Sequence, residues 1–449
     1  MNILYLYNET QTYTNAVYEH ISSFANYSSH CSFFCHQDQL TELHIDSRRF
    51  DAVGIHFSIR LPYDQLSAST IKFLKEYTGL KFLFIQDEYD HTQKTWSWIN
   101  TLGVQLVFTT VPEAGIEQIY PKDKFPNTKF VNNLTGYVPD KLQLFHDVLP
   151  PSQRPILIGY RARVLPVKYG QLGFDKVNIG KIVKSFCDEH GINNDINWTE
   201  ESRIYGEDWY KFMMSCRAML GSESGSNVFD WEGSLVKTVS QYKSQFKNVK
   251  DDEIYETFIR PIELDGVMNQ VSPRIFEAIA TRTVLVLFEG DYSGVVKAGV
   301  HFISVKKDGS NLNEVMELLH DGTYSDAIVE RAYQDVIASG KYSYQSFVNL
   351  VDENIECFLA PLVLDKSDKF DRDYKRQQWD NIASITTTPR RAAIPKQDTY
   401  YRKSNSIMSF GKKFYFVCRK KLYYLWSRLP ESVRRFLKPL IMKIFKRDY

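Results

Sequence analysis

Apolar and polar residues alternate along the first 145 residues in a pattern that predicts strands and helices in turn. Helical periodicity falls at residues 13–24 and 66–77. Short apolar runs, which are typical of buried strands, fall at residues 3–7, 31–35, 50–57, 80–85 and 104–109. Strands and helices that alternate in this way build a parallel sheet with helices on both faces, so we expect that architecture here.

The same alternation restarts after a proline-rich break at residues 149–155. Within the second stretch, a polar segment at about 231–270 has weak periodicity and is interpreted as an insertion. We therefore predict an α/β protein with two Rossmann-like domains facing each other across a cleft. Strands are expected at 156–159 and 283–288, helices at 181–190, 209–218, 272–280, 313–320, 326–338 and 344–358, and domains at 1–148 and 155–365, followed by a linker at 366–400.

Composition excludes several classes of protein. Hydrophobic residues make up 43% of the 449 residues and charged residues 24%, which suits a globular protein with a sizeable core. Six cysteines are too few for a disulfide-built scaffold. The chain opens on an apolar run without a basic flank, so we expect no export signal, reduced thiols and a cytoplasmic location.

Positive charge is concentrated at the C-terminal end. Residues 401–449 hold 14 Lys and Arg against 2 Asp and Glu, whereas the remainder holds 41 against 52. Leu, Ile, Phe, Tyr and Trp interleave with these basic residues, a pattern typical of a helix lying on an anionic membrane. We expect peripheral attachment to the inner face of the membrane and no nucleic-acid partner. A nucleic-acid arm and a tail helix packed on its own domain are the alternatives.

One segment, residues 272–290, has the features of a phosphate-binding helix start. Ser272 is a good N-cap residue and Pro273 suits the first helical position. A helix that begins there presents unpaired backbone N–H groups, and Arg274 in the first turn can bind a phosphate. Glu277, one turn later, can accept hydrogen bonds from a ribose diol.

This segment resembles the retaining family-4 branch of the GT-B glycosyltransferases. Glu277-Ala278-Ile279-Ala280 matches the start of the family pattern E-A-x-A-x-G-x-P-V-V, and Glu289-Gly290 matches its acidic-Gly loop. The resemblance assigns Glu277 to the ribose of the donor nucleotide. The chain departs from the pattern at Arg282 and Val284, and it has Asn269 where the family has a second glutamate.

Two further segments are similar to donor-binding loops of that family. Residues 159–170 resemble the turn G-R-x-x-P-x-K-G, which implies that Arg163 and Lys168 hold the donor diphosphate. A small polar loop would lie beside the donor sugar, and its glutamate could replace the acidic residue missing at Asn269. This loop comprises Glu223, Ser224, Gly225, Ser226 and Asn227.

Polar residues that follow strands of the first domain are candidates for positioning an acceptor hydroxyl. His56, Asp87 and Glu88 are predicted catalytic residues on this ground. A hydrogen-bonded structural histidine and capping carboxylates are the other interpretations. His-x-x-His and paired Cys-x-x-Cys motifs are absent, so we expect no metal and no cofactor, with a nucleotide-diphosphate sugar as co-substrate.

These observations together favour a glycosyltransferase that moves a sugar from a nucleotide-diphosphate donor to a hydroxyl acceptor. The resemblance implies a retaining, metal-independent hexosyltransferase, and the tail favours a lipid-linked or cell-surface glycan acceptor. Two alternatives stay open. One is a catalytically degenerate GT-B-like protein that binds sugar nucleotide or glycan, and the other is a nucleic-acid-binding protein.

Overall fold

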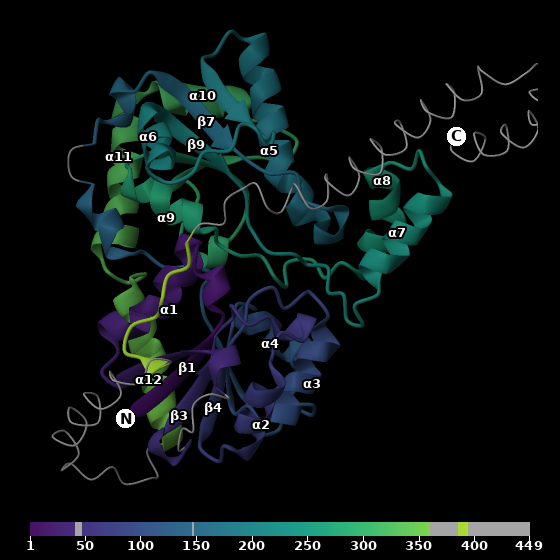
Figure 1. The fold of residues 1–449 in the computed structure, drawn as a ribbon. Coiled ribbons are helices and arrows are strands. Elements are labelled where there is room, and N and C mark those ends of the chain that lie inside the picture. The colour runs from purple at the N-terminus through teal and green to yellow at the C-terminus, as the bar shows by residue number, and fades with distance from the viewer. Residues whose placement is uncertain (41–46, 146–147, 360–384, 394–449) are drawn as a thin grey trace, which may run out of the picture. The chain divides into compact units, whose positions relative to one another are not determined.

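The computed structural model describes residues 1–40, 47–145, 148–359 and 385–393. These residues form two parallel α/β sheets in succession, each covered by helices on both faces (Figure 1). The predicted pair of Rossmann-like domains is thus confirmed. The basic segment 401–449 and most of the predicted linker lie outside the described residues.

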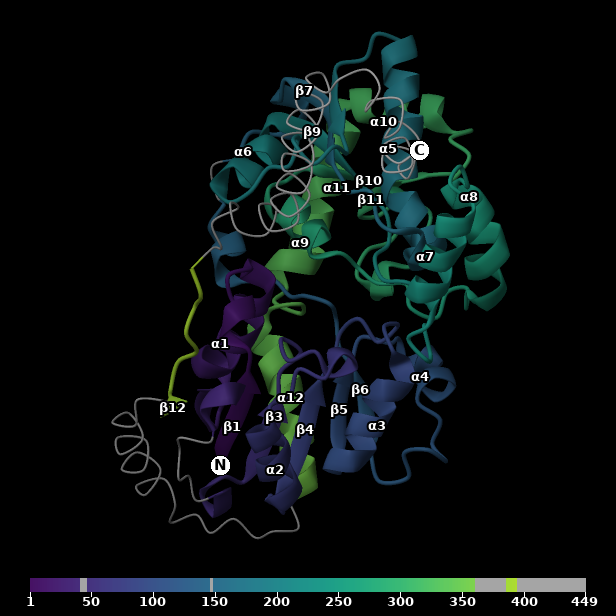
Figure 2. The ribbon, with the colours of Figure 1, turned by 45° about the vertical axis from the view of Figure 1, so that its right-hand side comes forward.

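The first domain contains a seven-stranded sheet in the order β12-β2-β1-β3-β4-β5-β6 (Figure 2). All neighbours in it pair in parallel except β12 with β2. Its strands are β1 (Asn2–Tyr7), β2 (Cys31–His36), β3 (Ala52–Ile55), β4 (Leu80–Phe84), β5 (Leu106–Thr109), β6 (Lys129–Asn132) and β12 (Ile385–Thr386). Its connecting helices are α1 (Asn15–Tyr27), α2 (Ala68–Glu76), α3 (Thr92–Leu102) and α4 (Glu113–Ile119).

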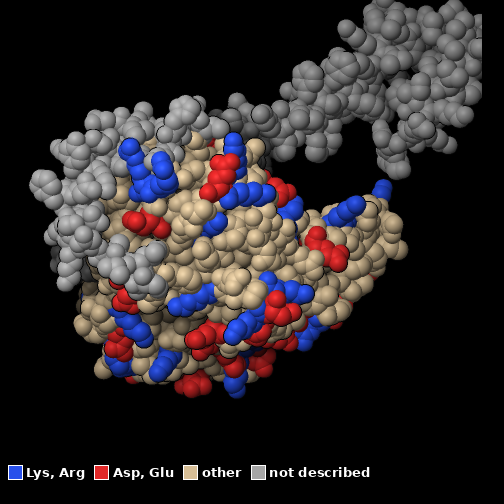
Figure 3. Space-filling model, turned by 90° about the horizontal axis from the view of Figure 1, so that it is seen from below, with Lys and Arg blue, Asp and Glu red and all other residues tan. Residues whose placement is uncertain are grey.

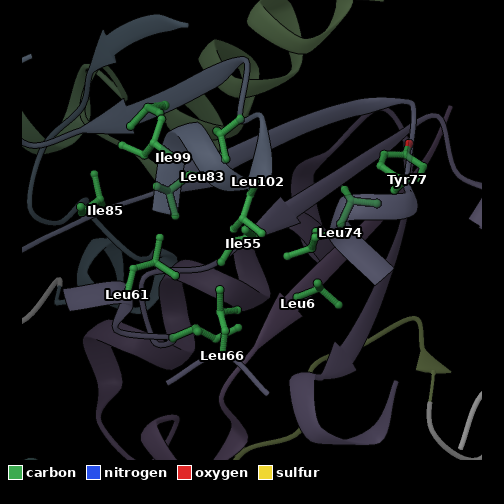
Figure 4. Packing of buried hydrophobic residues seen from close by; sticks show 14 of the residues in the cluster. Leu6, Ile55, Leu61, Leu66, Leu74, Tyr77, Leu83, Ile85, Ile99 and Leu102 are labelled. Atoms are coloured by element: carbon green, nitrogen blue, oxygen red, sulfur yellow. The ribbon is translucent and has the colours of Figure 1, made fainter. Parts of the chain in front are cut away.

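Alternate residues of these strands pack on opposite sides of the sheet. Leu6, Ile55 and Leu83 pack with α2 and α3 on one face (Figure 4). Tyr5 and Phe82, which are one residue out of step, pack with α1 on the other face. Both faces are therefore apolar, which explains why these strands appear as continuous hydrophobic runs in the sequence.

The second domain contains a five-stranded parallel sheet in the order β11-β10-β9-β7-β8. Its strands are β7 (Ile156–Arg161), β8 (Asn194–Asn197), β9 (Cys216–Gly221), β10 (Val284–Phe288) and β11 (Phe302–Val305). Its helices are α5 (Gly170–Glu189), α6 (Glu207–Ser215), α7 (Leu235–Gln245), α8 (Asp251–Ile254), α9 (Pro273–Ala280), α10 (Leu312–His320) and α11 (Gly322–Ala332). The segment interpreted as a weakly periodic insertion carries α7 and α8, which share a small apolar cluster containing Val239 and Ile254.

The chain returns to the first domain after the second is complete. Helix α12 (Tyr344–Leu359) packs against the face of the first sheet that carries Tyr5 and Phe82. Its Asp352 accepts hydrogen bonds from the hydroxyl of Ser28 at 3.0 Å and from the backbone N–H of Ser29 at 2.8 Å. Strand β12 then adds to the edge of the same sheet. Two segments that are late in the sequence thus complete the first domain.

The two passages of the chain between the domains lie side by side. The backbone N–H of Val138, on the outward passage, donates to the carbonyl of Tyr342 at 2.8 Å. The backbone N–H of Tyr344, on the return passage, donates back to Val138 at 3.4 Å. The domains are therefore joined by two hydrogen-bonded segments, not by one flexible linker.

Candidate functional site

A cavity of about 560 Å³ opens at the carboxyl ends of β7 and β9 and at the N-terminal ends of α6 and α9, all in the second domain. This edge of a parallel sheet is where ligands bind in open α/β folds. The first domain contributes Asn15, from the first turn of α1, to the cavity wall. The cavity is large enough for a ligand the size of a nucleotide.

Five Lys and Arg residues line this cavity, and two of them, Arg161 and Arg203, pair with carboxylates beside them. The other three are Arg163 after β7, Lys176 on α5 and Arg274 on α9. Arg274 donates to the backbone carbonyl of Arg161 at 2.5 Å, and its guanidinium carbon lies 5.1 Å from the centre of the Trp209 ring. Among the described residues, neither Arg163 nor Lys176 makes a hydrogen bond or an ion pair through its side chain. Three cations that converge without a carboxylate partner form a site for a multiply charged anion.

Lys176 is the most perturbed of these groups. Burial of the ammonium, together with the charges of Arg274 and Arg163, lowers its pKa to about 8, against a smaller opposing effect of Asp87. An anion bound beside these three cations would offset both the cost of burying the ammonium and the repulsion between the cations. The electrostatics of the cavity thus favour a negatively charged ligand.

Glu277 is a carboxylate that lines the same cavity. One of its oxygens accepts the indole N–H of Trp209 at 2.8 Å. Burial raises the pKa of Glu277, while the Trp209 hydrogen bond and the Arg274 charge lower it. The second oxygen makes no hydrogen bond within the described ranges, so it can accept hydroxyl groups of a ligand.

The start of α9 also contributes to the cavity. Ser272 is the N-cap residue with extended backbone angles, φ −86° and ψ 139°, and Pro273 follows at the first helical position. The Ser272 side chain caps none of the backbone N–H groups. The backbone N–H of Ile275 donates instead to the carbonyl of Ser272 at 2.9 Å. The positive end of the helix dipole, next to Arg274, still favours an anion at this point.

The polar loop after β9 is held mainly by contacts within the protein. Glu223 is 6% exposed, and one of its oxygens accepts the backbone N–H groups of Asp291 and Tyr292 at 3.1 and 2.9 Å. Its other oxygen accepts the side-chain amide of Asn269 at 2.6 Å. The structure therefore brings Glu223 to the asparagine that replaces a family glutamate, although Glu223 does not line the cavity.

Of the remaining loop residues, one lines the cavity and the others make contacts within the protein. Ser224 lines the cavity. Gly225 has φ 97° and packs so closely that an added Cβ would lie 2.1 Å from the carbonyl of Met268. Ser226 accepts the backbone N–H of Val228 at 3.1 Å, and Asn227 donates to Asn269 at 2.9 Å. The loop thus presents Ser224 to a ligand while its other members fix its conformation.

Lys168, predicted to hold the donor diphosphate, does not line the cavity. Its ammonium pairs with Asp90 of the first domain at 2.7 Å, and Arg60 pairs with the other oxygen of Asp90 at 3.2 Å. Lys168 therefore forms an ion pair between the two domains. Lys176, eight residues later, lines the cavity in its place.

Replacement of Lys168 with methionine is accordingly expected to change the affinity for a nucleoside diphosphate less than about threefold, because the lost contact is an ion pair within the protein. Replacement of Arg163 with alanine, measured by calorimetry in the same way, is expected to weaken binding at least tenfold. A larger loss from the lysine variant than from the arginine variant would restore the role predicted from the sequence.

The three predicted catalytic residues lie outside the cavity. Asp87, at φ 59°, accepts the Tyr89 hydroxyl at 2.6 Å and pairs with Arg60 at 3.3 Å. Glu88 is 1% exposed and accepts the backbone N–H of Thr110 at 2.8 Å, and burial raises its pKa to about 7.

His56 is fully buried and lies 3.0 Å from the ring nitrogen of His20, and burial lowers its pKa well below the ordinary value. Its other ring nitrogen lies 2.9 Å from the hydroxyl of Ser58. Like Glu88, it is surrounded by groups of its own domain. The catalytic roles of His56, Asp87 and Glu88 stay predictions.

Lys176 matches none of the motifs in the sequence, although the hydrophobic pattern of α5 carries a signal for it. The buried face of α5 contains Leu172, Gly180, Val183 and Cys187, and Lys176 lies on the same helical stripe. A lysine that interrupts an apolar stripe needs an anionic or polar environment at that point. Trp209, whose indole N–H contacts Glu277, was likewise assigned only to a helix.

In the described ranges, no group of three or more His, Cys, Asp or Glu side chains is arranged to hold a metal ion. No described helix combines the length and the apolar character needed to cross a bilayer.

Solved structures with similar folds are glycosyltransferases. An α-glucosyltransferase in complex with UDP and DNA is 11% identical, with a TM-score of 0.48 over 79% of this chain and 99% of that one. HepE from Anabaena in complex with UDP is 10% identical, with a TM-score of 0.45 over 80% and 100%. TarM is 12% identical, with a TM-score of 0.37 over 68% of this chain, which spans 54% of TarM.

No protein-family model matches the chain, and no curated protein matches its sequence. The solved structures overlap with TM-scores below 0.5 and at 10–12% identity. We therefore infer the function from the residues of the cavity.

Proposed function

We propose that the protein is a glycosyltransferase that takes its sugar from a nucleotide-diphosphate donor bound in the cavity of the second domain. The observation that carries this proposal is the convergence of Arg163, Lys176 and Arg274, three cations with no carboxylate partner among the described residues, next to Glu277. A diphosphate supplies the missing negative charge. A ribose diol supplies hydroxyl groups for the unused oxygen of Glu277.

The proposed chemistry follows from this arrangement. The bond between the anomeric carbon of the sugar and the diphosphate oxygen breaks, and the anomeric carbon bonds to the acceptor oxygen. The three cations and the start of α9 stabilise the charge that develops on the departing diphosphate. Glu277 is the only Asp or Glu that lines the described cavity, and it binds the ribose. The proton of the acceptor hydroxyl therefore passes to the departing diphosphate.

The stereochemistry, the absence of a metal ion and the nature of the acceptor are proposed from the sequence. The resemblance supports retention of the anomeric configuration and a reaction without a metal ion. The basic, aromatic segment 401–449 supports a lipid-linked or cell-surface glycan acceptor at the inner face of the membrane.

A donor panel tests the proposal. The purified full-length protein is incubated with UDP-, GDP-, ADP-, dTDP- and CMP-sugars, and released nucleotide is measured beside Arg163→Ala and Glu277→Ala variants. Release from one diphosphate donor, lost in both variants, is the expected result. Failure of every nucleotide to bind would contradict the proposal.

A binding protein without turnover is the second candidate, because Asn269 stands where the family pattern has a glutamate and pairs with Glu223. Binding of one donor without transfer or hydrolysis, with a range of glycan acceptors present, would favour it. The nucleic-acid alternative depends on residues 401–449. On the face shown in Figure 3, basic and acidic residues of the described chain are interspersed, unlike a continuous basic nucleic-acid surface.

A further inference from the structure

The segment 385–393, which we call the C-terminal strap, lies along the first domain close to the cavity. It begins with β12, where Ile385 is fully buried and pairs with Cys35 of β2. It then passes the loop between β1 and α1. The strap is thus a fixed part of the first domain, although more than 350 residues separate it from that loop in sequence.

Backbone hydrogen bonds hold the strap on both sides of Arg391. The backbone N–H of Arg390 donates to the hydroxyl of Tyr7 at 3.0 Å. The backbone N–H of Ala392 donates to the hydroxyl oxygen of Thr12 at 2.8 Å. Because the residues before and after it are both anchored, Arg391 has a defined position and direction.

The side chain of Arg391 contacts a residue of the cavity wall, although Arg391 does not itself line the cavity. Its guanidinium donates to the side-chain oxygen of Asn15 at 2.5 Å, and Asn15 is the residue of the first domain that lines the cavity. The guanidinium carbon also lies 4.9 Å from the centre of the Tyr18 ring. An amide oxygen and an aromatic face orient the group without neutralising it.

Arg391 therefore retains an uncompensated charge at this point. It is exposed, and it pairs with no carboxylate of the described residues. A guanidinium has five N–H donors, and Asn15 accepts one of them, so most of the donors are available to a ligand. Planar guanidinium groups are well suited to binding phosphate through two parallel hydrogen bonds.

We infer that Arg391 is a phosphate-binding residue, supplied by the C-terminal strap at Asn15, the residue of the first domain that lines the cavity. This inference rests on the proposed function, because it assigns the phosphate to the donor diphosphate. It makes the strap, which begins with the last strand of the first sheet, part of the donor site.

Binding to the full-length protein tests this role. Calorimetry is performed with the nucleoside diphosphate selected by the donor panel, with its unphosphorylated nucleoside and with inorganic pyrophosphate. Arg391→Gln is expected to lower the affinity for the nucleoside diphosphate and for pyrophosphate about tenfold and to leave the affinity for the nucleoside unchanged. Arg391→Lys keeps the positive charge but loses the planar guanidinium that can donate two parallel hydrogen bonds. Its affinity for the two phosphate ligands is expected to lie between those of the wild type and of Arg391→Gln.

Arg331→Gln is the matched control. This exposed arginine of α11 also makes one hydrogen bond, to the carbonyl of Val300 at 3.3 Å, and does not line the cavity. It is expected to bind all three ligands like the wild type. Thermal unfolding of each variant shows whether Arg391 is needed only to hold the strap.

The outcomes separate this inference from the donor proposal. Unchanged phosphate binding in Arg391→Gln, with or without a lower unfolding temperature, would overturn the inference. An equal loss of affinity for the nucleoside and for the phosphate ligands would also overturn the inference. Should the wild type bind pyrophosphate but no nucleoside diphosphate, the donor proposal fails, and the pyrophosphate measurement alone decides the role of Arg391. Binding of neither ligand would overturn both.

Discussion

Replacement of Lys176 with methionine is expected to stabilise the free protein and to weaken diphosphate binding at the same time. The ammonium is buried beside two arginines and lacks an anionic partner, so the folded protein disfavours its charged form. Methionine has a similar length and no charge. The penalty that it removes at pH 7 is up to about 3 kcal/mol, from the lowering of the pKa from 10.5 to about 8.

The pH dependence of this effect has a definite sign. Below about pH 8 the ammonium is charged in both the folded and the unfolded protein, and the folded state bears the full penalty. As the pH rises from about 8 towards 10.5, the folded state loses the proton first, so this group contributes progressively less destabilisation. The stability advantage of the methionine variant should therefore be largest at pH 7 and shrink at alkaline pH.

Urea unfolding at about pH 7 and pH 9.5, beside diphosphate binding at pH 7, measures both effects. Lys181→Met, on the exposed face of the same helix, is the control and should change neither quantity appreciably. The expected loss of affinity in Lys176→Met is about thirtyfold or more, from one charge-assisted contact in a partly dry cavity. A variant that is less stable than the wild type and binds the diphosphate equally well would refute the assignment.

Glu277 is expected to discriminate between ribose and deoxyribose. Hydrogen bonds from the ribose hydroxyls to a carboxylate contribute about 1.5–3 kcal/mol to the binding free energy. Glu277→Ala should therefore weaken nucleoside diphosphate binding by about ten- to a hundredfold. The wild type should also disfavour the 2′-deoxy nucleotide. In the alanine variant this preference should disappear, because the partner of the 2′-hydroxyl is gone.

Glu277→Gln separates this role from support of Trp209. The glutamine keeps an oxygen that can accept the indole N–H, whereas alanine leaves that N–H without its 2.8 Å partner. The unfolding temperature should therefore fall in the alanine variant and stay near the wild-type value in the glutamine variant. If the alanine variant loses affinity equally for the ribose and deoxyribose nucleotides, Glu277 acts through Trp209 and does not touch the sugar.

The sequence predicted what depends on local pattern. The buried strands were recognisable because both faces of each sheet are apolar. Arg163, Arg274 and Glu277 follow a strand or begin a helix at the carboxyl edge of the second sheet, and all three line the cavity. Positions of this kind are set by the nearest element, so spacing along the chain is sufficient to locate them.

What the sequence did not predict depends on distant partners. Lys168 lies just before α5 and Lys176 lies in its N-terminal half. The choice between them is decided by Asp90 of the other domain, which pairs with Lys168. His56 follows a strand, as a catalytic residue often does, but its ring turns inward to His20. Strand β12 has two residues, too few to show any periodicity.

The late return of the chain has a consequence for biosynthesis. During translation the first 148 residues emerge first, but one face of their sheet lacks α12 and its edge lacks β12 until the end of the described chain has been made. The second domain is built from one continuous stretch and needs no later segment for its sheet. The domain that is synthesised first is therefore the one that finishes folding last, and until then the part of its apolar face that α12 covers stays exposed and prone to aggregation.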